Sequence, residues 1–115
     1  MQPVALSDAI AVGEFPTTEQ IAILAKAGFK SLLNSQPEGE VDRLIPAAAT
    51  ADAARAAGLA YHFLPLETRR PSDAQIQAFS RAIATLPKPI YAFCYSGSRS
   101  AAAWALASSA FMDTD

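Results

Sequence analysis

The residue best suited to covalent chemistry is Cys94, the only cysteine in the chain, and Arg99 follows it five positions later. Between them stand Tyr95, Ser96, Gly97 and Ser98, and Ser100 follows the arginine. The apolar segment 89–93 is typical of a buried strand, and 101–111 is predicted to be a helix. A strand that leads through a glycine-containing loop into a helix directs backbone N–H groups and the positive end of the helix dipole toward one point. The sequence therefore predicts an anion-binding loop with a thiol at its first position.

Each residue type in this loop suits a role in such chemistry. Converging amides favour the thiolate of Cys94, which is the nucleophilic form. The planar guanidinium of Arg99 can hold two oxygens of an oxyanion, and Gly97 allows a positive φ or a close approach of the backbone to a ligand. Ser100 is expected to cap the helix or to donate a hydrogen bond to the sulfur. The alternative is that Cys94 is a buried thiol at a strand end and that Arg99 is an ordinary surface residue.

Length and composition limit the possible classes of protein. A chain of 115 residues can bury its own core, so we expect a single domain over 1–115. A net charge of −2 gives no reason to expect nucleic acid or an anionic membrane as a partner. One cysteine and one histidine cannot form an internal disulfide or a zinc cluster, so no metal or other cofactor is expected. Without a recognisable signal peptide or membrane span, the expected location is the cytoplasm.

Four strands separated by helices are expected to position the loop. The strands are predicted at 8–13, 29–33, 60–64 and 89–93. Capping boxes at Thr17–Gln20 and Ser72–Gln75 predict two helix starts, Gly28 is expected at the end of the first of these helices, and an alanine-rich helix over 46–57 ends at Gly58. Successive strands joined through helices require crossovers, so the fold should be α/β with three layers and a mainly parallel sheet of about four strands. The loop 34–40 follows a strand, which is where such sheets bind ligands.

The remaining candidates for chemistry lie around the loop 65–71. Glu67 and the nearby Asp73 are candidates for an acid, and Arg69 and Arg70 could attract anionic substrates at the rim of the site. The alternative for both arginines is an ordinary solvated surface position. His62 lies within a predicted strand, where a structural role is expected rather than that of a base.

The segments Ser31–Glu40, Gly58–His62 and Cys94–Ser100 together resemble the beta-lactamase-hydrolase-associated, phosphatase-like domain family. The resemblance covers nearly the whole chain. It implies the compact fold of tyrosine and dual-specificity phosphatases, with the cysteine strand at the centre of the sheet, and an activity described either as phosphatase or as sulfurtransferase. Two departures stand out: Gln36 occupies a position where members usually have an arginine, and members usually continue past the last helix, where residues 112–115 resemble the start of another one.

The length of the loop helps to choose between these activities. Tyrosine phosphatases have five residues between the cysteine and the arginine, whereas this chain has four, a spacing that resembles the rhodanese loop. The position of the phosphatase acid also corresponds to Thr68, which cannot donate a proton usefully. We therefore predict a cysteine-dependent sulfurtransferase in which a persulfide on Cys94 carries sulfur from a thiosulfate-like donor to a thiol or cyanide. The alternatives are a phosphatase with a phosphocysteine intermediate that acts on a phosphate-like anion, and a non-catalytic anion-binding module.

Overall fold

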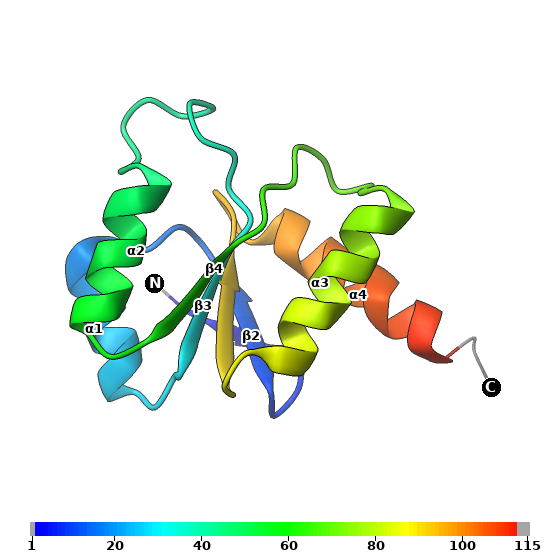
Figure 1. Ribbon diagram of the computed structural model, residues 1–115, viewed down its shortest axis with the longest axis horizontal. Coiled ribbons are helices and arrows are strands. Elements are labelled where there is room, and N and C mark those ends of the chain that lie inside the picture. The colour runs from blue at the N-terminus through cyan, green and yellow to red at the C-terminus, as the bar shows by residue number, and fades with distance from the viewer. Residues whose placement is uncertain (1, 113–115) are drawn as a thin grey trace.

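The computed structural model describes residues 2–112, which build a five-stranded sheet with the order β1-β2-β5-β3-β4 (Figure 1). The strands are Val4–Ala5 (β1), Ile10–Gly13 (β2), Ser31–Asn34 (β3), Ala60–Phe63 (β4) and Ile90–Phe93 (β5). β1 pairs with β2 in antiparallel fashion, and all the other neighbouring strands are parallel. The predicted mainly parallel α/β sheet is confirmed. The prediction missed β1, because two residues are too few to show an alternating pattern.

Four helices connect and cover the strands. They are Thr18–Lys26 (α1), Ala47–Ala56 (α2), Asp73–Thr85 (α3) and Ser98–Met112 (α4). Both predicted capping boxes are present, with reciprocal hydrogen bonds between Thr17 and Gln20 and between Ser72 and Gln75. Met112 ends α4, and residues 113–115 of the predicted further helix lie outside the described residues. Within residues 2–112, no helix is both long enough and apolar enough to cross a membrane.

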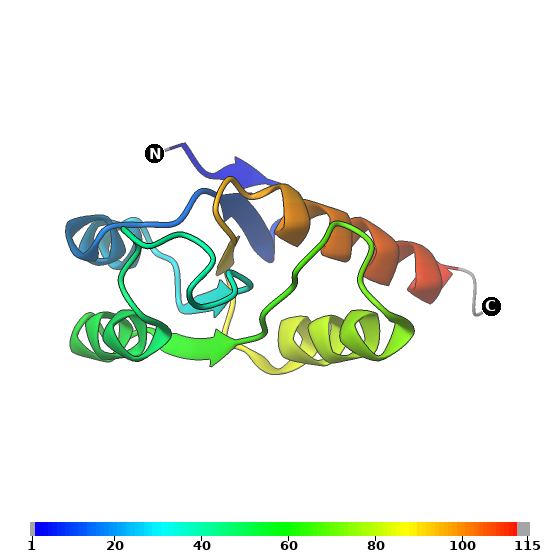
Figure 2. The same cartoon turned by 90° about the horizontal axis from the view of Figure 1, so that it is seen from above.

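The helices form two layers, one on each face of the sheet (Figures 1 and 2). On one face, Tyr91 and Phe93 of β5 pack in one cluster with apolar residues of α1 and α2. On the other face, Ile90 and Ala92 pack with residues of α3 and α4. The alternation along β5 follows from the two-residue period of a strand, and it gives the protein two cores separated by the sheet.

β5 is the central strand, with β2 on one side and β3 on the other. Its position matches what the family resemblance implied for the cysteine strand. The Tyr91 hydroxyl donates a 2.6 Å hydrogen bond to the Glu14 carbonyl, which ties the loop after β2 to the sheet. Burial raises the pKa of Tyr91, so its hydroxyl stays protonated and can serve as this donor. A Cβ at Gly13 would overlap the Tyr91 hydroxyl, so a side chain at this position would disturb the arrangement.

Candidate active site

Cys94 directly follows β5 and is 1% exposed. Its Sγ accepts a 3.1 Å hydrogen bond from the backbone N–H of Gly97. Gly97 has a φ of 100°, and a Cβ there would come 2.9 Å from the Gly13 carbonyl oxygen. The tight turn around the thiol therefore depends on glycine for two reasons, its backbone conformation and its close contact with the loop after β2.

α4 begins at Ser98, three residues earlier than the sequence predicted. The N–H of Ala101 already bonds the Gly97 carbonyl at 3.0 Å, because the chain reverses at the glycine and enters the helix at once. Arg99 and Ser100 therefore lie in the first helical turn. The prediction that Ser100 caps the helix or donates to the sulfur is wrong, since it lies inside the helix and its hydroxyl has no hydrogen-bond partner among the described residues. Near the true helix start, the N–H of Ser98 donates to the Ser96 hydroxyl at 3.4 Å.

An alanine at position 97 should destabilise the fold and impair the loop. The positive φ costs about 1–3 kcal/mol for a residue with a side chain, and the contact with the Gly13 backbone adds to that cost. Gly58→Ala is the matched control, because Gly58 also has a positive φ but its Cβ would meet nothing within 4 Å. Urea unfolding should show a larger loss for Gly97→Ala than for Gly58→Ala. Equal losses would mean that the contact with Gly13 is unimportant.

Arg99 is held by two loops that flank the end of β5. Its Nη2 donates to Glu40 Oε1 at 2.7 Å, and its Nη1 donates to Glu40 Oε2 at 3.2 Å and to the Leu66 carbonyl at 2.9 Å. Arginine carries five N–H donors. Two of them, on Nε and Nη2, have no partner among the described residues. Because these two donors lie along one edge of the guanidinium, they can bind two oxygens of an anion while Glu40 holds the other edge.

Figure 1 shows the origin of these contacts, since the β3–α2 and β4–α3 loops rise past the end of β5 on either side. Glu40 comes from the first loop and Leu66 from the second. Gln36 Nε2 also donates to Glu40 Oε1 at 3.0 Å, which orients the carboxylate. The hydrogen bond from Arg99 holds the pKa of Glu40 below its ordinary value. Sequence reasoning missed Glu40, although it lies in the loop 34–40, whose place after a strand was the available signal.

Glu40→Gln should weaken the site and alter its response to acid. The lowered pKa means that Glu40 stabilises the fold fully above its ordinary value of 4.5, and that this contribution is lost as the pH falls through the lowered pKa. The pair is partly exposed, so its contribution at pH 7 should be below about 1 kcal/mol. Urea unfolding of both proteins from pH 7 down to pH 2–3 should show the difference shrinking on acidification.

For a reaction of Cys94 with an anionic substrate, the same variant should lower kcat/KM about tenfold at neutral pH. The reason is that Arg99 loses the carboxylate that orients it. Glu19→Gln, at an exposed position in α1, serves as the control for removing a carboxylate. A stability difference that grows on acidification, or an unchanged kcat/KM, would contradict the assigned role of Glu40.

The other predicted residues are distributed around this centre. Tyr95 is 40% exposed, and its hydroxyl accepts a hydrogen bond from Arg43, whose guanidinium also lies over the ring at 5.4 Å from its centroid. The Ser96 hydroxyl donates to that of Ser98 at 3.1 Å. Four exposed residues lie in or just after the β4–α3 loop: Glu67, Arg69, Arg70 and Asp73. Within residues 2–112, no hydrogen bond joins their side chains to Cys94 or Arg99. Glu67 nevertheless follows Leu66, which contacts Arg99 through its carbonyl.

Three buried polar atoms around the loop have no hydrogen-bond partner among the described residues. They are the hydroxyls of Ser35 and Ser100 and the Oε1 atom of Gln36. Ser35 lies beside the end of β5, since its N–H donates to the Phe93 carbonyl at 2.8 Å. Buried polar groups are normally paired, so three unpaired ones gathered near the nucleophile depart from the usual pattern. In the described part of the chain, no group of three His, Cys, Asp or Glu side chains is placed to hold a metal ion.

Residues 4–111 match the family model of the beta-lactamase hydrolase-like protein, phosphatase-like domain. The chain belongs to this family. A beta-lactamase hydrolase-like protein from Xylella fastidiosa is 37% identical over 106 residues, which cover 92% of this chain and 25% of that protein. This phosphatase-like domain therefore spans about a quarter of the length of the curated relatives that it matches.

Solved structures share the fold of this domain. A putative phosphatase from Neisseria meningitidis superposes with a TM-score of 0.86 at 20% identity, covering 93% of this chain and 76% of the other. The kinase associated phosphatase, solved with its catalytic-site cysteine replaced by serine, has a TM-score of 0.77 at 17% identity, with coverages of 92% and 67%. TpbA from P. aeruginosa, in complex with phosphotyrosine, has a TM-score of 0.63 at 14% identity, with coverages of 83% and 54%.

These comparisons confirm the family resemblance and the tyrosine and dual-specificity phosphatase-like fold. They fit the phosphatase alternative better than the sulfurtransferase prediction, to which they lend no support. An enzyme of the phosphatase-like family is the coarser conclusion that they support.

Proposed function

We propose that this domain is a cysteine-dependent phosphatase that acts on small phosphate monoesters. The observation that carries the proposal is the buried Cys94 thiol, whose Sγ accepts the Gly97 N–H in a loop that also presents one edge of Arg99. Positive charge and backbone donors around a thiolate suit attack on an anionic phosphoryl group. The phosphatase-like fold of the domain and its neighbours supports the same choice.

The reaction would run in two displacement steps. In the first, the Cys94 thiolate forms a bond to phosphorus, the bond from phosphorus to the ester oxygen breaks, and the leaving group departs as an alkoxide or phenolate that takes a proton from water. In the second, water attacks the phosphocysteine, which releases inorganic phosphate and restores the thiolate. The free edge of Arg99 and the amides at the start of α4 would bind the phosphoryl oxygens in both steps.

Sulfur transfer is the second candidate, and one specific observation favours it. Only four residues separate Cys94 from Arg99, and α4 starts just before the arginine, so the loop is short. A terminal sulfur needs less room than a phosphoryl group. In this reaction the Cys94 thiolate would attack the outer sulfur of thiosulfate, sulfite would leave, and the persulfide would pass its sulfur to a thiol or cyanide.

Turnover assays on the purified chain distinguish these candidates. We expect release of phosphate from p-nitrophenyl phosphate, whose phenolate leaves without the help of a strong acid, and a much slower thiosulfate-dependent formation of thiocyanate from cyanide. The opposite ratio would overturn the proposal in favour of sulfur transfer. Absence of both activities would also overturn it, and would favour the anion-binding module.

A further inference from the structure

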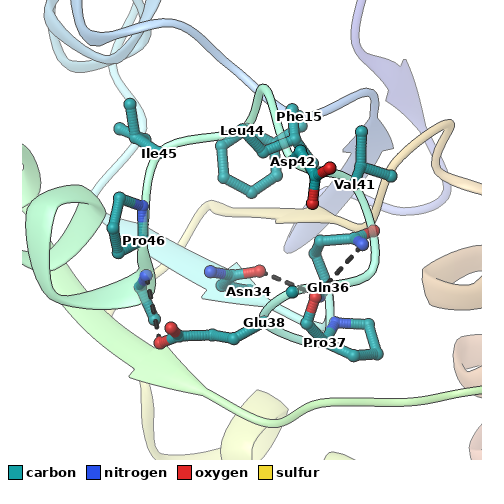
Figure 3. A pocket seen from close by; sticks show the side chains of 12 residues that line it. Phe15, Asn34, Gln36, Pro37, Glu38, Val41, Asp42, Leu44, Ile45 and Pro46 are labelled. Carbon is teal, nitrogen blue, oxygen red and sulfur yellow. Dashed lines mark hydrogen bonds between the residues drawn. The ribbon is translucent and has the colours of Figure 1, made fainter.

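The β3–α2 loop encloses a cavity of about 210 Å³ that the proposed mechanism does not use (Figure 3). Apolar side chains form much of its wall, among them Phe15, Leu44, Ile45 and Pro46. Its volume exceeds the roughly 30 Å³ that one water occupies in the liquid and lies below the 300–1,000 Å³ of sites for drug-sized ligands. The cavity therefore has the size for one functional group with a short carbon stem or a ring.

Two carboxylates line the cavity, those of Glu38 and of the exposed Asp42, and Glu38 Oε1 accepts the Ala47 N–H at 3.2 Å. Figure 3 shows the Asp42 carboxylate pointing into the cavity, and this carboxylate makes no hydrogen bond or ion pair with any other residue in 2–112. Gln36 is 3% exposed, and its Nε2 already donates to Glu40 at 3.0 Å and to the Pro37 carbonyl at 3.3 Å. Its Oε1 has no partner among the described residues, but this atom is fully buried and is therefore not available to a ligand in the cavity.

The other amide that lines the cavity, Asn34, is buried and makes two hydrogen bonds. Asn34 Nδ2 donates to the Tyr61 hydroxyl at 3.0 Å, and its Oδ1 accepts the Gln36 N–H at 2.9 Å. No lysine or arginine lines the cavity in the part of the chain that the structure describes, and Arg43 from the same loop binds Tyr95 instead. A cavity with two carboxylates and no cationic side chain in its lining suits a ligand group that donates hydrogen bonds and carries positive charge. The ring of Phe15 adds an aromatic wall, which attracts cations.

Short chains of hydrogen bonds link this cavity to the cysteine loop. The N–H of Phe15 donates to the carbonyl of Tyr95, the residue after Cys94, at 3.2 Å. On another wall, Gln36 binds Glu40, which in turn binds Arg99. Figure 2 shows the β3–α2 loop beside the turn that leads into α4. Gly39 and Val41, the neighbours of Glu40, line the cavity, so the cavity lies beside the residues that hold Arg99.

We propose that the cavity recognises an ammonium group on the substrate, so that the preferred substrates are phosphate monoesters of small amines. This proposal rests on the proposed phosphatase function and adds the class of alcohol that leaves. The anionic end lies at Cys94 and Arg99, and the ammonium lies against Asp42, Glu38 and the ring of Phe15.

The test compares two substrates that differ only in the charged group, tyramine phosphate and 4-ethylphenyl phosphate. For the natural chain, kcat/KM for tyramine phosphate should exceed that for 4-ethylphenyl phosphate about tenfold. This factor corresponds to the combined free energies of a partly exposed ion pair and a cation–aromatic contact. Asp42→Asn should reduce this preference to within about twofold and leave the ethyl compound unaffected. The matched control is Asp8→Asn, in the exposed turn before β2 at the opposite edge of the sheet. Equal kcat/KM values for both substrates, or an equal effect of the two variants, would overturn the proposal.

A binding measurement separates this proposal from the proposed function. Calorimetry with 2-phenylethylamine, which has no phosphate, should show binding to the natural chain and roughly fivefold weaker binding to Asp42→Asn. If 4-ethylphenyl phosphate is hydrolysed but the amine neither binds nor improves turnover, the cavity proposal is wrong and the phosphatase function stands. If neither phosphate ester reacts but the amine binds in an Asp42-dependent way, the cavity binds amines and the phosphatase function fails.

Discussion

Serine in place of Cys94 should lower kcat/KM for p-nitrophenyl phosphate by about 10⁴-fold or more, because a serine hydroxyl stays protonated without a neighbouring base. The only histidine, His62, is exposed on the edge strand β4 and cannot act as that base from there. Serine Oγ can accept the Gly97 N–H as the sulfur does, so the fold should survive. The measurement combines steady-state turnover with the midpoint of thermal unfolding, which should change by only a few degrees.

This variant should also keep its affinity for inorganic phosphate, since Arg99 and the loop amides remain in place. Calorimetric titration with phosphate provides that control. Retention of more than about one part in a hundred of the turnover would show that Cys94 is not the nucleophile.

Arg99→Lys should lower kcat/KM by about 10²- to 10³-fold, which is the usual loss when a preorganised donor to transition-state charge is removed. Lysine has one ammonium centre and cannot bind the Glu40 carboxylate in two places while it presents a second pair of donors to a phosphoryl group. The loss should fall on kcat as well as on KM, because the paired donors of arginine can match the equatorial oxygens that the phosphoryl group presents only in the transition state.

The control for this substitution is Arg81→Lys, at an exposed position in α3. It should leave kcat/KM within about twofold of the natural chain, as expected for a surface substitution. If Arg99→Lys behaves like this control, a single positive charge is sufficient, and the paired geometry with Glu40 has no catalytic importance.

Much of the fold follows from local signals in the chain. The Thr17–Gln20 and Ser72–Gln75 pairs mark helix starts because each box satisfies two free backbone donors. β5 stands out because its residues are buried on both faces, which requires a continuous apolar run. The early start of α4 was harder to foresee, since Ser98 to Ser100 favour caps and helix starts about equally and only the turn at Gly97 decides.

The supporting contacts of the site could not be derived in the same way. Cys94 and Arg99 are close in the sequence, so their proximity follows from the loop alone. Glu40 is 59 residues from Arg99, and their contact depends on β3 lying next to β5 in the sheet. The strand order is a property of the whole fold and no local pattern encodes it. The same reason hides the links from Phe15 to Tyr95 and from Arg43 to Tyr95.

The most direct test of the phosphatase proposal is the mass of the intact protein after rapid acid quenching of a reaction with p-nitrophenyl phosphate. We predict a fraction of the chain that is heavier by one phosphoryl group, with the added mass on Cys94 after peptide mapping and absent in Cys94→Ser. A parallel reaction with thiosulfate should leave the mass unchanged. A chain that gains one sulfur atom from thiosulfate and no phosphoryl group from the ester would contradict the proposal and establish sulfur transfer instead.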